Sequence, residues 1–231
     1  MIREFPLFIV NLKNYKQASG DNILKFLEAA NVIRNKLNIN ILIALPHLEL
    51  YYYVRNYKQY TSFLMAQSFD VIEYGGSTGH IPLMKLYDFG IRYSLLNHSE
   101  NKVDLNKLIE LYKGLIKIPD FKVIICVDSI DELKRLINAC IKPYAYAIEP
   151  PELIGTGRSV SKYKPEVISE AVSIGRRYGL KILCGAGVSN REDVIAALRL
   201  GADGILVASA IAKQEDPYDK MYDMALGLLN V

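Results

Sequence analysis

Short apolar runs alternate with amphipathic stretches along the whole chain, and this alternation limits the fold more than any other feature. Eight runs are predicted to be buried strands, at residues 5–10, 39–45, 61–66, 90–96, 121–127, 144–148, 181–184 and 204–207. Most of the stretches between them carry apolar residues at helical spacing. Strands that alternate with helices pair in parallel through right-handed crossovers, so we expect an α/β fold.

The predicted strands are nearly continuous apolar runs, which is typical of strands that are covered on both faces. A closed (β/α)8 barrel provides such cover, and its usual length of ~250 residues, with ~200 tolerated, suits this chain. No linker or low-complexity tract divides the sequence, so we expect residues 1–231 to form a single barrel domain that carries the catalytic site. The alternative is a doubly wound open sheet, but no Gly-x-Gly-x-x-Gly fingerprint or Walker loop follows any strand.

Several helix ends are marked by capping residues. Ser129 and Glu132 have the spacing of a capping box, in which the serine caps the helix and the glutamate binds back. The segment 189–192 repeats this spacing. A third helix is expected to begin at Pro165, since proline is favoured in a first turn, and to end at Gly179.

Composition excludes several classes of protein. The 28 Lys and Arg residues against 25 Asp and Glu give a net charge of +3, and the charges are scattered singly, so nucleic acid is not an expected partner. No stretch reaches the ~18 apolar residues of a membrane span, and residues 1–13 do not resemble a signal peptide, so we expect a cytoplasmic protein. The three cysteines lack Cys-x-x-Cys spacing and no His-x-x-x-His motif occurs, so neither a disulfide framework nor a metal site is expected.

Polar residues and glycines follow several of the predicted strands. In a parallel barrel all strands point their C-terminal ends to one face, so residues that directly follow strands meet there. They are Asn11 and Lys13 after the first strand, Asn97 and His98 after the fourth, Glu149 after the sixth, and Gly187, Ala208 and Ser209 after the last two. A histidine, a carboxylate and a lysine beside backbone anion sites are able to move a proton next to an anionic substrate. Each also has a structural alternative, such as a solvated lysine, a packing histidine or a glycine that lets a helix approach the barrel.

The loop after Glu149 combines rigid and permissive residues. Pro150 and Pro151 lock φ at its start, whereas Gly155 and Gly157 permit positive φ and let main-chain N–H groups approach an anion. We interpret the loop as a stiff-ended flap that closes over a phosphate and presents Glu149 to it. The alternative is an ordinary strand-to-helix connection with a solvated glutamate.

Four signatures occur in a specific order along the chain. They are Asn11-x-Lys13, Asn97-His98-Ser99-Glu100, Glu149-Pro150-Pro151-Glu152-Leu153-Ile154-Gly155-Thr156-Gly157, and Cys184-Gly185-Ala186-Gly187-Val188 with Val207-Ala208-Ser209. Through them the chain resembles the triosephosphate isomerases, in the short form found in archaea, over essentially its whole length. The resemblance implies a TIM barrel that interconverts dihydroxyacetone phosphate and D-glyceraldehyde 3-phosphate in glycolysis and gluconeogenesis, without cofactor or metal.

The resemblance also implies a role for each site residue. Glu149 is expected to be the base, His98 the neutral electrophile that polarises the substrate oxygens, and Lys13 a positive charge near the developing oxyanion and the phosphate. Asn11 is expected to position the substrate. Backbone N–H groups are expected to hold the phosphate at Ile154, Gly155, Gly187, Ala208 and Ser209.

The chain departs from the commoner members of this family at two places. Their flap begins Pro-Val-Trp, whereas Pro150-Pro151-Glu152 stands here and the chain has no tryptophan; and Ala208-Ser209 replace the two glycines that many relatives have. The loop 75–80, with Thr78 near its tip, resembles the family's subunit-interlocking loop and implies a homodimer or a homotetramer. Two alternatives to the isomerase are another phosphate-binding barrel, such as a phosphoribosyl isomerase or a synthase, and a non-catalytic barrel.

Overall fold

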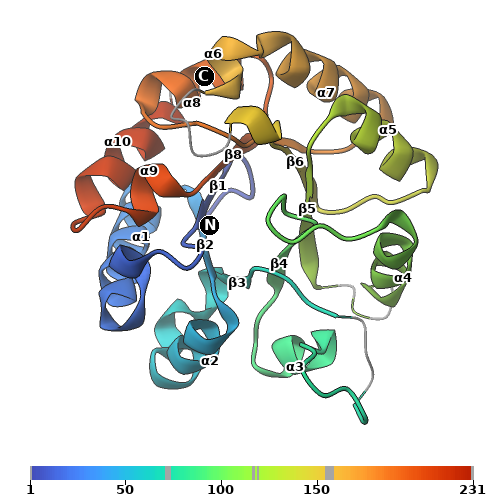
Figure 1. The fold of residues 1–231 in the computed structure, drawn as a ribbon. Coiled ribbons are helices and arrows are strands. Elements are labelled where there is room, and N and C mark those ends of the chain that lie inside the picture. Colours follow the sequence, from blue (N-terminus) through green and yellow to red (C-terminus); the bar gives the residue numbers. More distant parts are fainter. Residues whose placement is uncertain (1, 71–73, 116–117, 119, 154–158, 230–231) are drawn as a thin grey trace.

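The computed structural model describes residues 2–70, 74–115, 118, 120–153 and 159–229, and within them the chain forms a closed parallel barrel (Figure 1). Its strands follow one another around the barrel in chain order: β1 (Leu7–Asn11), β2 (Asn40–Leu45), β3 (Leu64–Ala66), β4 (Tyr93–Leu96), β5 (Lys122–Val127), β6 (Ala145–Ile148), β7 (Ile182–Cys184) and β8 (Gly204–Val207). The last strand pairs in parallel with the first, from Leu7 opposite Gly204 to Val10 opposite Val207. The barrel prediction is therefore confirmed, and the open sheet is excluded.

The helices form an outer ring around the strands (Figure 1). They are α1 (Ile23–Leu37), α2 (His47–Asn56), α3 (Leu83–Asp88), α4 (Leu105–Leu115), α5 (Ile130–Asn138), α6 (Val160–Tyr163), α7 (Pro165–Tyr178), α8 (Arg191–Arg199), α9 (Ser209–Ala212) and α10 (Tyr218–Gly227). In the described ranges no helix is long and apolar enough to cross a bilayer.

All eight predicted strands are present, but several are shorter than predicted. β3 is the extreme case, since residues 58–63 form a 3-10 helix and only three residues remain in the strand. β4 begins three residues after Gly90, which has a left-handed φ of 86° and turns the chain into the strand. Apolar periodicity therefore predicted the existence of each strand better than its first residue.

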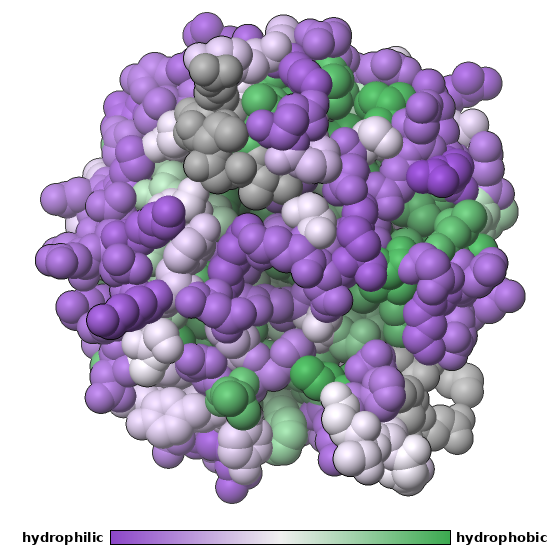
Figure 2. All heavy atoms as spheres, viewed as in Figure 1, coloured by the Kyte–Doolittle hydropathy of each residue, from purple (hydrophilic) through white to green (hydrophobic). Residues whose placement is uncertain are grey.

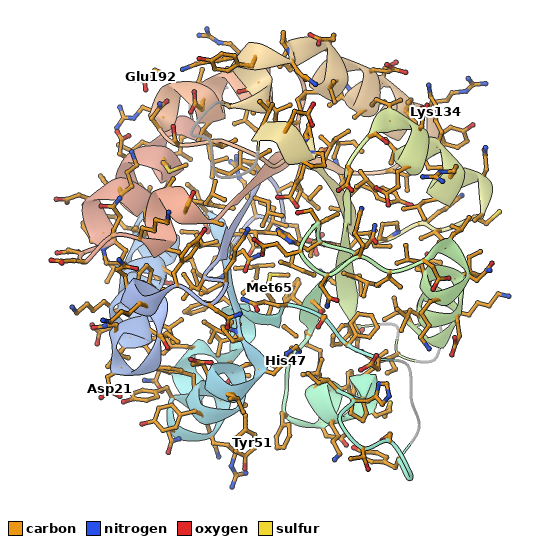
Figure 3. The ribbon with its side chains drawn as sticks, in the orientation of Figure 1. Asp21, His47, Tyr51, Met65, Lys134 and Glu192 are labelled. Carbon is orange, nitrogen blue, oxygen red and sulfur yellow. The ribbon has the colours of Figure 1, made fainter. Side chains whose placement is uncertain are left out.

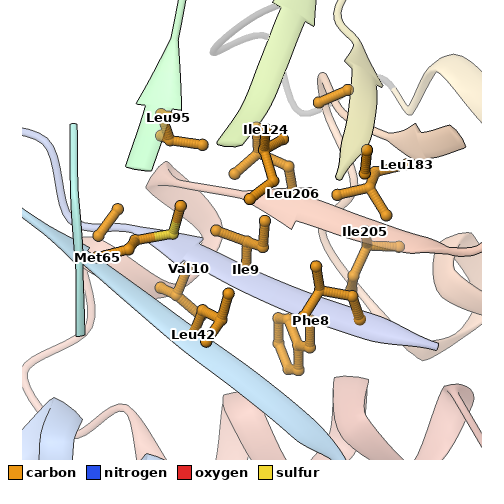
Figure 4. Packing of buried hydrophobic residues seen from close by; sticks show 14 of the residues in the cluster. Phe8, Ile9, Val10, Leu42, Met65, Leu95, Ile124, Leu183, Ile205 and Leu206 are labelled. Carbon is orange, nitrogen blue, oxygen red and sulfur yellow. The ribbon is translucent and has the colours of Figure 1, made fainter. Parts of the chain in front are cut away.

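The core consists of apolar side chains on both faces of the strands, since successive side chains point alternately into the barrel and toward the helices. Figure 4 shows this packing, in which the side chains of different strands meet: Phe8, Ile9 and Val10 of β1, Leu42, Met65, Leu95, Ile124, Leu183, Ile205 and Leu206. Nearly every one of these is completely shielded from solvent. The strands are buried on both faces because the helices cover their outer side, which explains why their sequences do not alternate with polar residues. Charged side chains such as those of Lys134 and Glu192 instead point outward from the helix ring (Figure 3).

The capping predictions are partly confirmed. Ser129 caps α5 by accepting a hydrogen bond from the Glu132 N–H at 3.2 Å, but the Glu132 side chain binds the Asp128 N–H, one residue before the predicted partner. The second box is displaced by one residue: Asn190, not Ser189, caps α8, because its side chain accepts from the Asp193 N–H at 2.9 Å.

Both predicted ends of α7 are confirmed. Pro165 opens this helix, and Gly179 closes it with a left-handed φ of 68°.

Candidate active site

Glu149 lies directly after β6, inside the mouth of the barrel. Its N–H donates to the Val127 carbonyl of β5 at 2.8 Å, which continues the strand ladder and places the side chain over the core. The residue is only 5% exposed. Within the described part of the chain, its Oε2 atom has no hydrogen-bond partner, so a buried carboxylate oxygen is left with its lone pairs available.

Gly185 makes the room that this side chain occupies. A Cβ atom at position 185 would stand 2.3 Å from Glu149 Cγ and 3.0 Å from its Oε1. The Gly185 N–H also donates to the carbonyl of Ile148, the residue before Glu149, at 3.0 Å. This bond fixes Gly185 and Glu149 side by side at the ends of neighbouring strands. The glycine after β7 is therefore required by the close approach of the carboxylate.

His98 follows β4 and faces Glu149, with 3.8 Å between His98 Nε2 and Glu149 Oε2. On the other side of the ring, Nδ1 accepts the backbone N–H of Glu100 at 3.2 Å. A nitrogen that accepts a hydrogen bond carries no proton, so the neutral ring holds its proton on Nε2. The imidazole thus presents an N–H donor toward the carboxylate.

Lys13 and Asn11 come from the end of β1 and hold each other. Asn11 Oδ1 accepts the Lys13 N–H at 3.1 Å, and Lys13 has a left-handed φ of 48°. Gln67, which sequence reasoning did not single out, donates to the same Oδ1 at 3.0 Å. With Oδ1 occupied, the Asn11 amide offers its N–H₂ donors. The Lys13 ammonium pairs with Glu100 Oε1 at 2.8 Å.

The loop after β7 is held by a buried aspartate. Ala186 and Gly187 adopt left-handed φ values of 63° and 70°. Asp193, 2% exposed, accepts the Ser189 N–H at 2.9 Å and pairs with the Lys162 ammonium at 2.6 Å. This carboxylate fixes the end of the loop, and its sequence signal was its position three residues after Asn190, where helix caps bind back.

One cavity of about 470 Å³ collects these groups. Each predicted site residue that the structure describes lines it: Asn11, Lys13, His98, Glu149, Gly187, Ala208 and Ser209. Ile154 and Gly155 lie outside the described residues. The cavity is also lined by Tyr15, Glu100 and Lys213, and sequence reasoning assigned no role to these three residues. The Lys213 ammonium lies 5.2 Å from the centre of the Tyr15 ring, in a cation–π contact.

Two buried thiols flank the carboxylate region. Burial raises the pKa of Cys126 well above its ordinary value, and the Glu149 carboxylate raises it further. Burial likewise raises the pKa of Cys184, with a smaller contribution from Asp193. Both therefore remain neutral at physiological pH and add no negative charge beside Glu149. The third thiol, Cys140, is exposed.

The other histidines stand apart from this cavity. His47, at the start of α2, bonds the Ser68 carbonyl at 2.8 Å, and burial lowers its pKa. His80 pairs with Asp70 at 3.3 Å in the loop before α3. Across the residues that the structure describes, no three His, Cys, Asp or Glu side chains gather in a way that could hold a metal ion. The reactive groups of the cavity are thus the carboxylate of Glu149, the imidazole N–H of His98 and the ammonium of Lys13, a set suited to proton transfer.

Comparison with known proteins gives a consistent result. A family model described as triosephosphate isomerase matches residues 6–225. Curated proteins of that name are similar to this chain over nearly all of both sequences: that of Pyrobaculum calidifontis is 38% identical over 226 residues (97% of this chain, 96% of the relative), and that of Methanopyrus kandleri 37% over 225 residues (96% and 98%). The Thermoplasma volcanium protein is 41% identical over 211 residues (90% and 94%).

The contact between Gly185 and Glu149 leads to a test. We expect Gly185→Ala to push the carboxylate aside and to lower kcat by about 10²-fold, since a misplacement near 1 Å has that effect. Gly179→Ala is the control for a destabilising glycine substitution outside the cavity: its methyl group meets no atom within 4 Å but strains the left-handed φ of 68°, so it should lower stability and leave kcat unaltered. Steady-state kinetics of both variants check this; a Gly185→Ala enzyme with unchanged kcat would show that the carboxylate position is unimportant.

Proposed function

This chain belongs to the triosephosphate isomerase family, and we propose that Glu149, His98 and Lys13 carry out its reaction. The enzyme is an isomerase that interconverts dihydroxyacetone phosphate and D-glyceraldehyde 3-phosphate. The observation that carries the proposal is the buried Oε2 of Glu149, which has no hydrogen-bond partner in the described ranges and lies 3.8 Å from His98 Nε2 in the same cavity as Lys13. The base and the N–H donor therefore face the same cavity.

Glu149 acts as the base. In the forward direction it takes a proton from the carbon beside the substrate carbonyl, and the electron pair of that C–H bond moves to give an enediolate. A proton also moves from the hydroxyl oxygen on that first carbon to the oxygen of the former carbonyl, and the protonated carboxyl returns its proton to the neighbouring carbon. Together these transfers complete the isomerisation without loss or gain of atoms. The buried Oε2 supports this role, because among the described residues no hydrogen bond competes for the lone pair that takes the proton.

His98 and Lys13 stabilise the enediolate. The Nε2–H of His98 donates to the substrate oxygens as negative charge develops on them, and the Lys13 ammonium adds a positive charge. The Nδ1 contact with the Glu100 N–H supports this assignment, since it keeps the His98 proton on the side that faces Glu149. Asn11 positions the substrate through its free N–H₂ group.

Main-chain N–H groups bind the phosphate. The N–H groups of Ser209 and Ala210 open α9 and have no partner within that helix. Gly187 lies beside them in the same cavity with a left-handed φ, a backbone shape found in anion-binding loops. Ala208, at the end of β8, is proposed for the same role. We assign Ile154 and Gly155 to this site on the family resemblance alone.

The sequence alone also allowed a different phosphate-binding barrel enzyme or a non-catalytic barrel. Purified enzyme with D-glyceraldehyde 3-phosphate, coupled to a dehydrogenase that consumes dihydroxyacetone phosphate, separates them. Rapid turnover supports the proposal, whereas folded protein without turnover contradicts it. We also propose that residues 1–231 work as one catalytic domain in the cytoplasm, where the family's glycolytic reaction takes place.

Shortening the base provides the first test. We expect Glu149→Asp to retract the carboxylate by one methylene and to lower kcat by about 10²-fold or more, because the proton transfer distance grows. Glu170→Asp makes the same change in an exposed ion pair with Lys134 and should leave kcat unaltered. If Glu149→Asp retains wild-type kcat in the coupled assay, Glu149 is not the base.

Replacement of the electrophile provides the second test. We expect His98→Gln to reduce kcat by about 10²-fold with a smaller change in KM, because the N–H acts mainly on the transition state. His47→Gln serves as the control, since His47 does not line the cavity. An unchanged kcat in His98→Gln would assign the electrophile to another group.

We propose further that the protein is a homo-oligomer, either a dimer or a tetramer. Leu48 and Tyr51 of α2 are 86% and 53% exposed, and the Tyr51 ring meets the exposed Phe89 ring edge-on at 5.2 Å. Tyr74, beside the loop 75–80, bonds Asp88 of α3. Figure 2 shows pale and green side chains gathered at its lower edge, over α2 and α3, and Tyr51 points outward there in Figure 3. Such an apolar patch is typical of a subunit interface.

A charge placed in this patch should separate the subunits. We expect light scattering to give a multiple of the 26.1 kDa chain mass for the wild type and a smaller species for Leu48→Glu. Leu229→Glu, at a residue that is 51% exposed elsewhere, should keep the wild-type mass. A wild-type protein that is monomeric at micromolar concentration contradicts the proposal.

A further inference from the structure

Next to His98, four polar side chains form a group that we call the Glu132 cluster: Asn97, Lys102, Asp128 and Glu132. Asn97 and Lys102 lie in the turn after β4, Asp128 follows β5, and Glu132 is in the first turn of α5. None of the four lines the active-site cavity. The reaction as derived above assigns them no role.

Asn97 is the link between this cluster and the site. It immediately precedes His98, is 1% exposed, and has a left-handed φ of 61°, a conformation that costs a non-glycine residue energy. Its Nδ2 donates to the Cys126 carbonyl at 2.8 Å and to Glu132 Oε1 at 2.9 Å. These contacts hold the residue in the conformation from which the chain enters His98.

The same side chain closes the turn that carries His98. Asn97 Oδ1 accepts the Val103 N–H at 3.0 Å, so one amide joins both ends of the segment 97–103. Inside that segment, the Glu100 N–H binds His98 Nδ1 and the Glu100 carboxylate pairs with Lys13. Displacement of Asn97 would therefore move the His98 ring.

Glu132 in turn is held by charge. Its Oε1 accepts from Asn97 and Lys102, and its Oε2 accepts from the Asp128 N–H at 2.7 Å and from Lys102 at 2.9 Å. Lys102 also pairs with Asp128 Oδ2 at 2.9 Å. Burial would raise the pKa of the Glu132 carboxyl, but these hydrogen bonds outweigh burial and hold the pKa below its ordinary value. The carboxylate is thus ionised at neutral pH and uses both oxygens.

We propose that Glu132, held by Lys102, is a positioning residue for the isomerase reaction, and that it acts through Asn97 to fix the place of the His98 imidazole. The inference rests on the proposed role of His98. Glu132 and Lys102 do not touch the reacting atoms, so their effect is on geometry and reaches kcat only through His98.

Two variants test the effect of the cluster on turnover. Glu132→Gln keeps the shape but cannot accept hydrogen bonds at its N–H₂ end, so we expect kcat to fall about tenfold with KM within about twofold, as for a displacement of less than 1 Å. Lys102→Met should reproduce this result. Lys134→Met is the matched control. Lys134 lies in α5, as Glu132 does, and its substitution removes a lysine–glutamate ion pair of 2.9 Å that has no contact with Asn97.

A double-mutant cycle with His98→Gln separates positioning from general destabilisation. If Glu132 acts through His98, Glu132→Gln should lower kcat in the wild type but cause no further loss in His98→Gln, while it lowers the melting temperature equally in both. Glu132→Gln should likewise cause no further loss in an Asn97→Gly background, where the left-handed φ is retained but the amide link is absent.

The outcomes distinguish a failure of the proposed role of His98 from a failure of the positioning role of Glu132. If His98→Gln keeps wild-type kcat, the proposed role of His98 fails, and the inference fails with it. If His98→Gln is slow but Glu132→Gln and Lys102→Met are fully active, only the inference is overturned. It is also overturned if Glu132→Gln lowers kcat by the same factor in both backgrounds. Should Glu132→Gln not fold, Lys102→Met in the same cycle decides.

Discussion

The parallel pairing of β8 with β1 is the interaction on which the rest of the structure depends, because it closes the sheet into a barrel. It requires Gly204, where a Cβ atom would lie 2.1 Å from the Leu7 carbonyl oxygen. Closure brings all strand ends to one mouth, so Asn11 at the end of β1 comes to share a cavity with Ala208 just after β8. The pairing of β8 with β1 therefore creates a site from residues almost two hundred positions apart in the sequence.

Within that mouth, the proposed reactivity depends on a shielded carboxylate, that of Glu149, one of whose oxygens has no hydrogen-bond partner among the described residues. Gly185 provides the space for Glu149, and the protonated thiol of Cys126 lies next to it without adding charge. The imidazole opposite is oriented by a backbone N–H and, in our proposal, by the Glu132 cluster. The reactive groups are thus few, and most of the surrounding contacts serve to hold them in place.

Much of this arrangement could be predicted before the structure. Apolar runs indicated eight strands, and the rule that parallel strand ends converge selected Lys13, His98 and Glu149. The helix start at Pro165 and its end at Gly179 were also correct. What failed was local: two of the capping predictions misjudged which side chain binds which N–H, because serine, asparagine and aspartate compete for adjacent donors, and one residue of shift changes little in the sequence pattern.

By itself, the sequence determined the order of elements, the buried strands and the residue types at their ends, because these depend on hydrophobic periodicity and on chain neighbours. Only the tertiary structure decided that Gln67 holds Asn11, that Lys162 pairs with Asp193, and that Glu132 reaches Asn97. These partners are separated by as many as 56 positions, and no local pattern specifies them. They meet because the closed barrel brings neighbouring strand ends within hydrogen-bond distance.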